Sequence, residues 1–192
     1  MKTLVFATNN QHKLDEVQAM VGSNFKLKSL KDIGCVADIP ETGTTFEENA
    51  SQKSRYIFNH FQVDCFSDDS GLEVDALDGE PGVYSAHYSG SRDTEANMQM
   101  VLDKLGNIEN RTARFRCVIS LILNGQEYFF EGSAEGRIAA ERSGKAGFGY
   151  DPIFMPDGYE QTFSEMTAEE KNKISHRGKA MAKLVAFLSK AG

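Results

Sequence analysis

The sequence predicts a mixed α/β fold in which a twisted sheet is flanked by helices and two lobes enclose a central substrate cleft. Three observations favour it: strand and helix patterns alternate early, a long hairpin follows, and capping signals open two closing helices. We assign all 192 residues (1–192) to a single domain, because no linker, internal repeat or low-complexity segment interrupts the chain.

The first part of the chain supplies the early alternation. Lys2 to Ala7 reads as a buried strand, and His12 to Val21 has the periodicity of an amphipathic helix. Phe25 to Leu30 alternates as a strand does. Thr45, with Glu48 three residues later, forms a capping box that opens a further helix.

The middle of the chain is expected to contain two strand pieces and a helix. Cys65 to Ser67 and Leu72 to Leu77 read as strand pieces on either side of a polar DDSG segment. Asp93 to Leu105 reads as a helix.

A long hairpin and two helices complete the predicted fold. Two strands, Arg111 to Leu123 and Gln126 to Ala139, are joined by Asn124-Gly125, which is the strongest two-residue hairpin signal in the chain. Thr167 and Ser175 then occupy N-cap positions of two closing helices.

Composition restricts the class of protein. Apolar residues make up 40% of the chain, which is ordinary for a packed core, and no apolar run approaches the roughly 18 residues of a membrane span. Without a signal-peptide pattern at the N-terminus, we expect a cytoplasmic protein. The net charge of −7 argues against a broad nucleic-acid surface. Three widely spaced cysteines read as small apolar residues of a reducing compartment.

The junction between the first strand and helix is polar, and it lacks the Gly or Pro of a tight turn. Thr8 to Lys13 reads TNNQHK. Free backbone N–H groups and the positive end of a helix dipole make such a junction an anion site, and Lys13 adds a full charge. A polar loop with a solvated lysine is the alternative interpretation.

The segment before and inside the second helix carries a lysine in an unusual place. Lys53 falls on the same face as Phe46 and Ala50, so it either reaches the helix edge or lines a cleft and meets a phosphate. Glu48 is explained by the capping box. Glu41 has no such explanation, and it is the better candidate for a magnesium ligand.

Adjacent carboxylates in the DDSG segment suggest a cation site. Asp68 and Asp69 repel each other unless a cation offsets their charge, and paired Asp residues at a strand end suit Mg²⁺. One of them could instead act as a general base on an attacking water. An Asx-turn at the strand end is the alternative that needs no function.

Two later segments offer contacts for a nucleotide. Glycines interleave with Phe148 and Tyr150, so the backbone can approach a ligand while an aromatic ring stacks on a flat base. His176 and Arg177 follow the N-cap Ser175, where an anion or a carbonyl oxygen could be held. A bulge and a solvated helix start are the respective alternatives.

Together these segments provide local positive charge, a carboxylate cluster and a platform for a base. This combination is typical of metal-assisted attack on a nucleoside polyphosphate. Neither a Walker loop nor a dinucleotide fingerprint is present in the sequence, which argues against the usual kinase or ATPase.

At this point the sequence resembles the non-standard purine nucleoside triphosphate pyrophosphatases, also called inosine triphosphate or dITP/XTP pyrophosphatases. The resemblance runs almost end to end, through the following segments: ATNNQHK at 7–13, ETGTTFEENA at 41–50, SDDSGLEVDAL at 67–77, GEPGVYSAHYSG at 79–90, GFGYDPIF at 147–154 and EEKNKISHRGKA at 169–180. Several ordered motifs at these spacings are far more specific than any one of them.

The resemblance implies a role for each candidate residue. Asp69 is expected to accept the proton and to bind Mg²⁺ with Glu41 and Asp68, while Lys13 and Lys53 assist catalysis. The family's (S/T)xNxxK motif matches Thr8, Asn10 and Lys13. The full set of expected nucleotide contacts is Thr8, Asn9, Asn10, Gln11, His12, Lys13, Ser70, Phe148, Gly149, Tyr150, Asp151, Lys171, His176 and Arg177.

The resemblance also implies the reaction. Hydrolysis between the α and β phosphates of dITP, ITP or XTP would give the nucleoside monophosphate and pyrophosphate, with Mg²⁺ as cofactor and a homodimer as the assembly. A donor facing the 6-oxo group, such as Arg177, would reject the 6-amino group of adenine.

Two other functions are weighed against this one. A related Maf-type pyrophosphatase would act on pyrimidine or modified nucleotides, and the GFGYDPIF and SHRGKA segments argue against it. A nucleotide-binding regulator without turnover would need the same phosphate and base contacts, but it would not need the carboxylates. No membrane or nucleic-acid partner is expected.

Overall fold

The computed structural model describes residues 2–191, of which His12 and Ala191 are described by their backbone alone. Among these residues, six strands form one mixed sheet in the order β2-β1-β3-β4-β5-β6. Their bounds are β1 Lys2–Phe6, β2 Phe25–Lys28, β3 Cys65–Val74, β4 Thr112–Leu123, β5 Gln126–Ile138 and β6 Phe154–Pro156. β1 pairs in parallel with β2 and β3, whereas β5 pairs antiparallel with β6.

In the described part of the chain, five α-helices and several short 3₁₀ helices accompany the sheet. The α-helices are α1 Gln11–Val21, α2 Phe46–Phe61, α3 Thr94–Leu105, α4 Ala168–Ile174 and α5 His176–Ala191. The 3₁₀ helices are η1 Gly22–Asn24, η2 Lys31–Ile33, η3 Asp75–Leu77, η4 Gly82–His87, η5 Asp151–Ile153 and η6 Phe163–Glu165. Within residues 2–191, no helix has the length and apolar character that crossing a membrane requires.

The chain divides into two compact units. Unit 1 comprises the residues up to Asp69, Val118–Glu131, and the residues from Ala180 onward. Unit 2 comprises Ser70–Cys117 and Gly132–Lys179.

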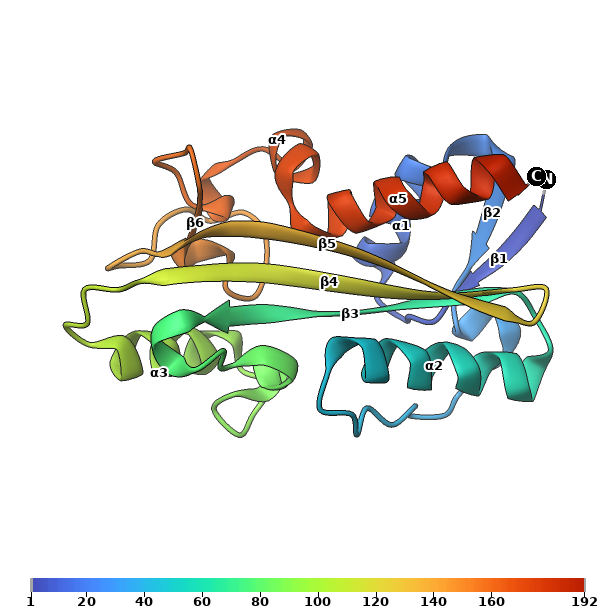
Figure 1. Cartoon of the computed structure of the whole chain (residues 1–192), viewed down its shortest axis with the longest axis horizontal. Coiled ribbons are helices and arrows are strands. Elements are labelled where there is room, and N and C mark those ends of the chain that lie inside the picture. Colours follow the sequence, from blue (N-terminus) through green and yellow to red (C-terminus); the bar gives the residue numbers. More distant parts are fainter. Residues whose placement is uncertain (1, 192) are drawn as a thin grey trace. The chain divides into compact units, whose positions relative to one another are not determined.

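In unit 1, helices cover both faces of the strands. α2 lies on one side, and α1 and α5 lie on the other (Figure 1). Because successive strand residues point to opposite faces, Val5 and Cys65 pack with Ile57 of α2. On the other face Phe6 of β1 stacks on Phe66 of β3 with ring centroids 4.5 Å apart. The apolar alternation of two parallel strands therefore fixes where α1 and α2 lie.

In unit 2, an aromatic group forms the centre of the core. The ring of Phe115 lies 4.6 Å from that of Phe154 and 5.8 Å from that of Phe163. Met98 and Val101 of α3 belong to the same buried cluster. This core fixes the start of β6 and the segment that follows it.

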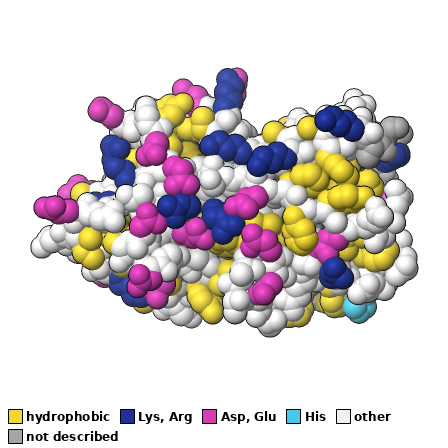
Figure 2. Space-filling view, viewed as in Figure 1, with side chains coloured by type: hydrophobic (Ala, Val, Ile, Leu, Met, Phe, Trp, Pro, Cys, Tyr) yellow, Lys and Arg dark blue, Asp and Glu magenta, His cyan; other side chains and the backbone are white. Residues whose placement is uncertain are grey.

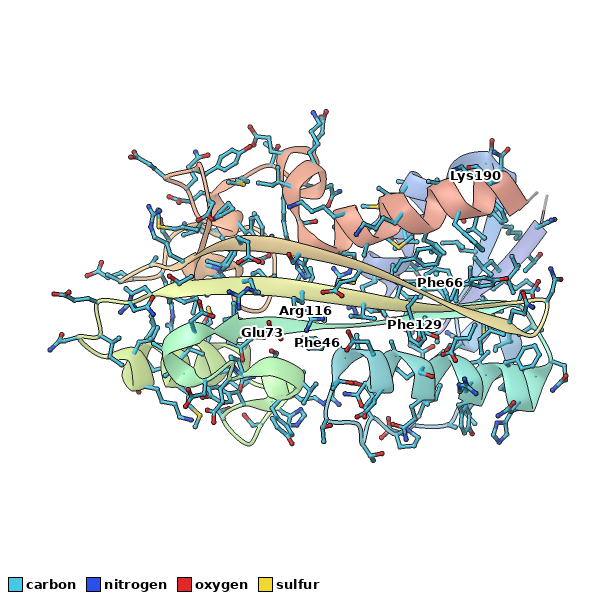
Figure 3. All side chains as sticks on the ribbon, in the orientation of Figure 1. Phe46, Phe66, Glu73, Arg116, Phe129 and Lys190 are labelled. Carbon is cyan, nitrogen blue, oxygen red and sulfur yellow. The ribbon has the colours of Figure 1, made fainter. Side chains whose placement is uncertain are left out.

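Unit 2 also carries a network of ion pairs across neighbouring strands. Basic and acidic side chains lie next to one another on the surface of this unit (Figure 2). Arg116 of β4 points toward Glu73 of β3, with 3.2 Å between Nη1 and Oε1 (Figure 3). Arg114 lies 2.9 Å from Asp75 and 3.0 Å from Glu135. These cross-strand pairs reinforce the strand order on one face of the sheet.

The structure confirms most predicted elements within one or two residues. Asn124 and Gly125 have φ of 51° and 78°, as the predicted two-residue turn requires. Thr167 forms the expected capping box with Glu170, and Ser175 Oγ accepts the Gly178 N–H at 3.1 Å.

Two local predictions were wrong. β3 continues through the DDSG segment without a break, since it extends from Cys65 to Val74. Thr45 does cap α2, because its side chain accepts the Glu48 N–H at 3.1 Å, but the Glu48 carboxylate binds the N–H of Thr44 at 2.7 Å. The N-cap bond of the predicted capping box is therefore present. The Glu48 carboxylate, however, accepts the N–H of Thr44, one residue before the N-cap residue Thr45.

Candidate active site

The polar junction after β1 lies at the carboxyl end of a parallel strand pair, where α/β sheets bind ligands. β1 and β3 are in register at Phe6 and Phe66, and Ala7 N–H donates to the Phe66 carbonyl at 2.8 Å. Asn10 is the N-cap of α1, because its Oδ1 accepts the Lys13 N–H at 3.2 Å. Thr8 Oγ1 accepts the Asn10 N–H at 3.1 Å. The junction is therefore an ordered helix start stabilised by its own side chains.

Three other residues of this junction have different surroundings. Asn9 Oδ1 accepts the Lys31 N–H at 3.1 Å, and Gln11 Nε2 donates to Asp15 Oδ1 at 2.7 Å on the surface of α1. His12, predicted as a nucleotide contact, has a side chain outside the described part of the chain.

A cavity of about 380 Å³ in unit 1 opens beside this junction. It is lined by Asn9, Asn10, Gln11, Leu14, Ser29, Lys31, Gly34, Cys35 and Val36. Its lining contains no acidic side chain and neither Lys13 nor Lys53, so it is not the location of the charged cluster described next.

The unbroken β3 separates the two adjacent carboxylates onto opposite faces of the strand. Asp68 points to the α1 side, where Lys13 Nζ lies 3.3 and 3.2 Å from its two carboxylate oxygens. Ser67 and Asp69 point to the α2 side, where Ser67 Oγ donates to the Ala50 carbonyl. The strand thereby reduces the repulsion that the sequence pattern suggests.

Lys53 lies at the centre of this cluster. Its Nζ donates to the Asp68 carbonyl at 2.6 Å and lies 3.1 Å from Glu41 Oε1. Burial alone would lower the pKa of Lys53, but the charges of Asp68, Glu41 and Asp69 more than offset that effect and raise it above its usual value. Lys53 is therefore a charged group held among carboxylates, and its side chain is only 13% exposed, unlike a lysine that reaches solvent at the helix edge.

Asp69 is the most perturbed carboxyl group of the cluster. Its pKa is raised to about 6, chiefly by burial and also by the nearby charges of Glu41 and Asp68, while Lys53 and a hydrogen bond from Asn49 act in the opposite direction. A carboxyl group with this pKa changes its protonation state close to neutral pH, which suits a group that accepts a proton.

The donor set fits a hard cation that retains part of its own hydration shell. Glu41 and Asp69, which both act on Lys53, offer carboxylate oxygens, the ligands that Mg²⁺ prefers. Asp68, the third expected ligand, offers its own carboxylate beside Lys13 on the other face of the strand. No three His, Cys, Asp or Glu side chains within residues 2–191 form a ready metal site. A Mg²⁺ ion typically takes a few carboxylate ligands from a protein and the others from water or phosphate oxygens.

In unit 2, the glycine-aromatic loop is fixed by a buried ion pair. Asp151 Oδ2 accepts the Phe148 N–H at 3.0 Å and lies 2.6 Å from Lys171 Nζ. Gly147 has φ of 79°, and a Cβ there would collide with the Asp151 carboxylate. Phe148 is 53% exposed, and the Lys171 ammonium lies 4.7 Å from its ring centroid. The loop thus exposes an aromatic ring to solvent, and a buried ion pair beneath the ring fixes the loop backbone.

Residues at the start of α5 lie near this ring. Arg177 Cζ lies 5.5 Å from the Phe148 centroid, and Arg177 Nη2 lies 3.5 Å from Ser70 Oγ. The His176 ring stacks on Phe115 at 4.7 Å. His176 and Arg177 are both buried, which excludes a solvated helix start. Tyr150 is also buried, and its hydroxyl donates to the Ser85 carbonyl at 2.6 Å.

The candidate residues therefore form one group in each unit. Unit 1 brings together Lys13, Glu41, Lys53, Asp68 and Asp69, with Thr8 and Asn10 at the start of α1. Unit 2 brings together Ser70, Phe148, Asp151, Lys171 and Arg177. Gly149 is part of the same loop, half-buried beside Phe148.

One residue of the unit 1 group was missed from the sequence. Asn49 is buried and donates a hydrogen bond to Asp69. The sequence contained one sign of this role. Asn49 lies inside a predicted helix, on the same face as Phe46 and Lys53, and an asparagine is unfavourable there unless its side chain has a hydrogen-bond partner.

Curated proteins similar to this chain along nearly its whole length carry the name dITP/XTP pyrophosphatase. The dITP/XTP pyrophosphatase of Christiangramia forsetii is 51% identical over 188 residues, covering 97% of this chain and 99% of that protein. The dITP/XTP pyrophosphatase of Bacillus subtilis is 45% identical over 193 residues, covering 98% of both chains.

Solved structures show the same fold. The Ham1 protein of Staphylococcus aureus superposes with a TM-score of 0.94 at 40% identity, covering 100% of both chains. The nucleoside-triphosphatase, dITP/XTP pyrophosphatase, of Mycobacterium abscessus gives a TM-score of 0.81 at 43% identity, covering 95% of this chain and 98% of that one. The family model described as Ham1 family matches residues 4–187. The chain belongs to the Ham1 family.

Proposed function

We propose that this protein hydrolyses the non-standard purine nucleoside triphosphates dITP, ITP and XTP to the nucleoside monophosphate and pyrophosphate. The observation that carries the proposal is the half-buried Asp69 carboxyl group, with a pKa of about 6, beside Lys53 and Glu41. Relatives named dITP/XTP pyrophosphatase, about half identical over nearly the whole chain, support the substrate class.

The residues of unit 1 would carry out the bond cleavage. Asp69 accepts a proton from water as the water oxygen bonds to phosphorus, and the bond between the α and β phosphates breaks, so that pyrophosphate leaves with the electron pair. Lys13 and Lys53 are drawn from their carboxylate partners to the phosphates and offset the charge that develops on the leaving group. Mg²⁺, held by Asp69 with Glu41 and Asp68, would add further positive charge at the phosphates.

The residues of unit 2 would select the base. Phe148 offers an exposed ring for stacking, with Lys171 and Arg177 beside it. A 6-oxo group can accept a hydrogen bond from Arg177 or a nearby backbone N–H, whereas the 6-amino group of adenine leaves that donor without an acceptor. Such a mismatch at a buried donor discriminates strongly between substrates.

The experiment that tests the proposal separates turnover from binding. Asp69→Asn should bind dITP but lose most of its hydrolysis, because the amide cannot accept the proton. The matched control Asp38→Asn changes an exposed aspartate of the same unit and should keep the parental rate. If Asp69→Asn hydrolysed dITP at the parental rate, the assignment of Asp69 as the proton acceptor would be wrong. If the unsubstituted protein bound dITP without hydrolysing it, a nucleotide-binding function without turnover would replace our proposal. Faster hydrolysis of dTTP or UTP than of dITP would instead favour the Maf-type specificity.

The proposal includes magnesium dependence, a homodimer and a cytoplasmic location. The carboxylate donor set supports magnesium, and resemblance to the family supports the dimer. Loss of activity in EDTA with recovery on adding Mg²⁺, and a molar mass near twice 21.2 kDa by light scattering, are the expected results. Cell fractionation tests the location.

A further inference from the structure

The loop that carries Glu41 is held against α2 by side chains of that helix. Three consecutive backbone N–H groups, of Thr42, Gly43 and Thr44, donate to Gln52 Oε1, Asn49 Oδ1 and Glu48 Oε2 at 2.9, 2.7 and 2.7 Å. The loop therefore follows the first turns of the helix closely. This course brings the Glu41 carboxylate to within 3.1 Å of Lys53.

Asn49 is more deeply buried than Glu48 and Gln52, the other two side chains that accept hydrogen bonds from the loop. It is 2% exposed, whereas Glu48 is exposed and Gln52 is half-buried. Because its Oδ1 accepts the Gly43 N–H, its Nδ2 is left to donate, and it donates to the Asp69 carboxylate. One buried amide thus joins the loop of Glu41 to the carboxylate of Asp69.

The contact with Gly43 leaves no room for a side chain on the loop. A Cβ at Gly43 would lie 2.6 Å from Glu48 Cβ and 2.8 Å from Asn49 Oδ1. The backbone of the loop therefore lies directly on the Asn49 amide. Movement of that amide would be transmitted both to the loop and to Asp69.

We propose that Asn49 is a positioning residue that holds Asp69 and the Glu41 loop in one fixed geometry. The inference rests on the proposed function, in which Asp69 accepts the proton. A hydrogen bond from the Asn49 amide to the Asp69 carboxylate restricts the orientation of that carboxylate. Outer partners of this kind orient the reacting group, and their loss commonly lowers activity 10- to 100-fold.

The substitution Asn49→Asp tests the bond to Asp69 separately from the bond to the Gly43 N–H. The new carboxylate still accepts the Gly43 N–H, but it cannot donate to Asp69 and repels it. We expect kcat for dITP to fall about 10- to 100-fold while KM stays within about threefold, since Asn49 is not among the expected nucleotide contacts. Calorimetric binding of an α,β-methylene analogue of dITP should likewise be close to parental.

Asn97 provides a matched control in unit 2. It is also a buried helical asparagine, and its amide accepts the Ser89 N–H at 2.7 Å and donates to the Ala86 carbonyl at 3.2 Å, without touching a carboxylate. Asn97→Asp should lower the melting temperature with kcat within about threefold of parental. Asn49→Ala, which introduces no buried charge, should fold and still lose kcat.

The outcomes separate the positioning role from the proposed function. A parental kcat in Asn49→Asp or Asn49→Ala, or an equal loss in Asn97→Asp, would overturn the positioning role. A rise in KM at unchanged kcat would also overturn it, because the amide would then act on binding. Absence of pyrophosphate release from dITP by the unsubstituted protein would refute the proposed function instead.

Discussion

The buried pair of Asp151 and Lys171 should stabilise unit 2 only when both partners are present. Their side chains are 4% and 11% exposed, with 2.6 Å between Oδ2 and Nζ. Removing one partner from such a pair leaves the other charge buried, which costs about 3–5 kcal/mol. Asp151→Asn and Lys171→Met should each therefore destabilise the protein by about that amount, whereas the double variant should lose much less than the sum.

A double-mutant cycle measured by urea unfolding tests this prediction. We expect a coupling energy of at least about 2 kcal/mol, within the range for residues in direct contact. The control cycle uses Glu169 and Lys173 on the same helix, a pair whose side chains are 83% and 70% exposed and 3.3 Å apart. Its coupling should be close to zero. If the effects of Asp151→Asn and Lys171→Met added to within about 0.5 kcal/mol, the reasoning about this pair would be refuted.

Three further predictions concern the loop and the carboxylate cluster. Gly147→Ala should lower the free energy of unfolding by more than the roughly 1–2 kcal/mol that a left-handed backbone costs, because the new Cβ also collides with Asp151. Gly149→Ala is the control: its φ is also positive, but no atom lies within 4 Å of the new Cβ, so it should lower the free energy of unfolding less in the same urea experiment. The pKa of Asp69 is about 6 in the folded protein, against an ordinary value of 3.8. Without metal, protonation of Asp69 therefore stabilises the folded state fully below pH 4, and this contribution of about 3 kcal/mol is lost as the pH rises through 6. Asp69→Asn should abolish this part of the pH dependence, and an unchanged profile would contradict it. Lys53→Met removes the charge that most opposes protonation of Asp69, so the acid limb of kcat/KM for dITP should move to higher pH; a limb that stays or falls would exclude Asp69 as its source.

Local sequence patterns predicted most of the secondary structure because their causes are local. Two parallel strands and their helices follow from periodicity, and the start of α4 follows from Thr167 and Glu170, which satisfy each other's backbone groups. The Asn124-Gly125 turn follows from the positive φ that both residues tolerate. These signals involve residues within one turn of helix or one hairpin.

The same reasoning failed where distant parts of the chain decide the structure. The polar DDSG segment reads as a break, but β3 continues there because each Asp finds a lysine on its own face of the strand. Asn49 shows no short motif, since its partners are Gly43 in a loop and Asp69 in a strand. The burial of His176 depends on Phe115 in the aromatic core of unit 2, which an N-cap signal does not reveal.

The measurement that most directly tests the central claim is product identification across a panel of nucleotides. The protein is incubated with dITP, XTP, dATP, dGTP or dTTP, with Mg²⁺ or with EDTA, and pyrophosphate is quantified separately from orthophosphate. Our account predicts pyrophosphate from dITP and XTP, little from the other three, and none in EDTA. Orthophosphate as the product, or equal rates for dITP and dATP, would contradict it.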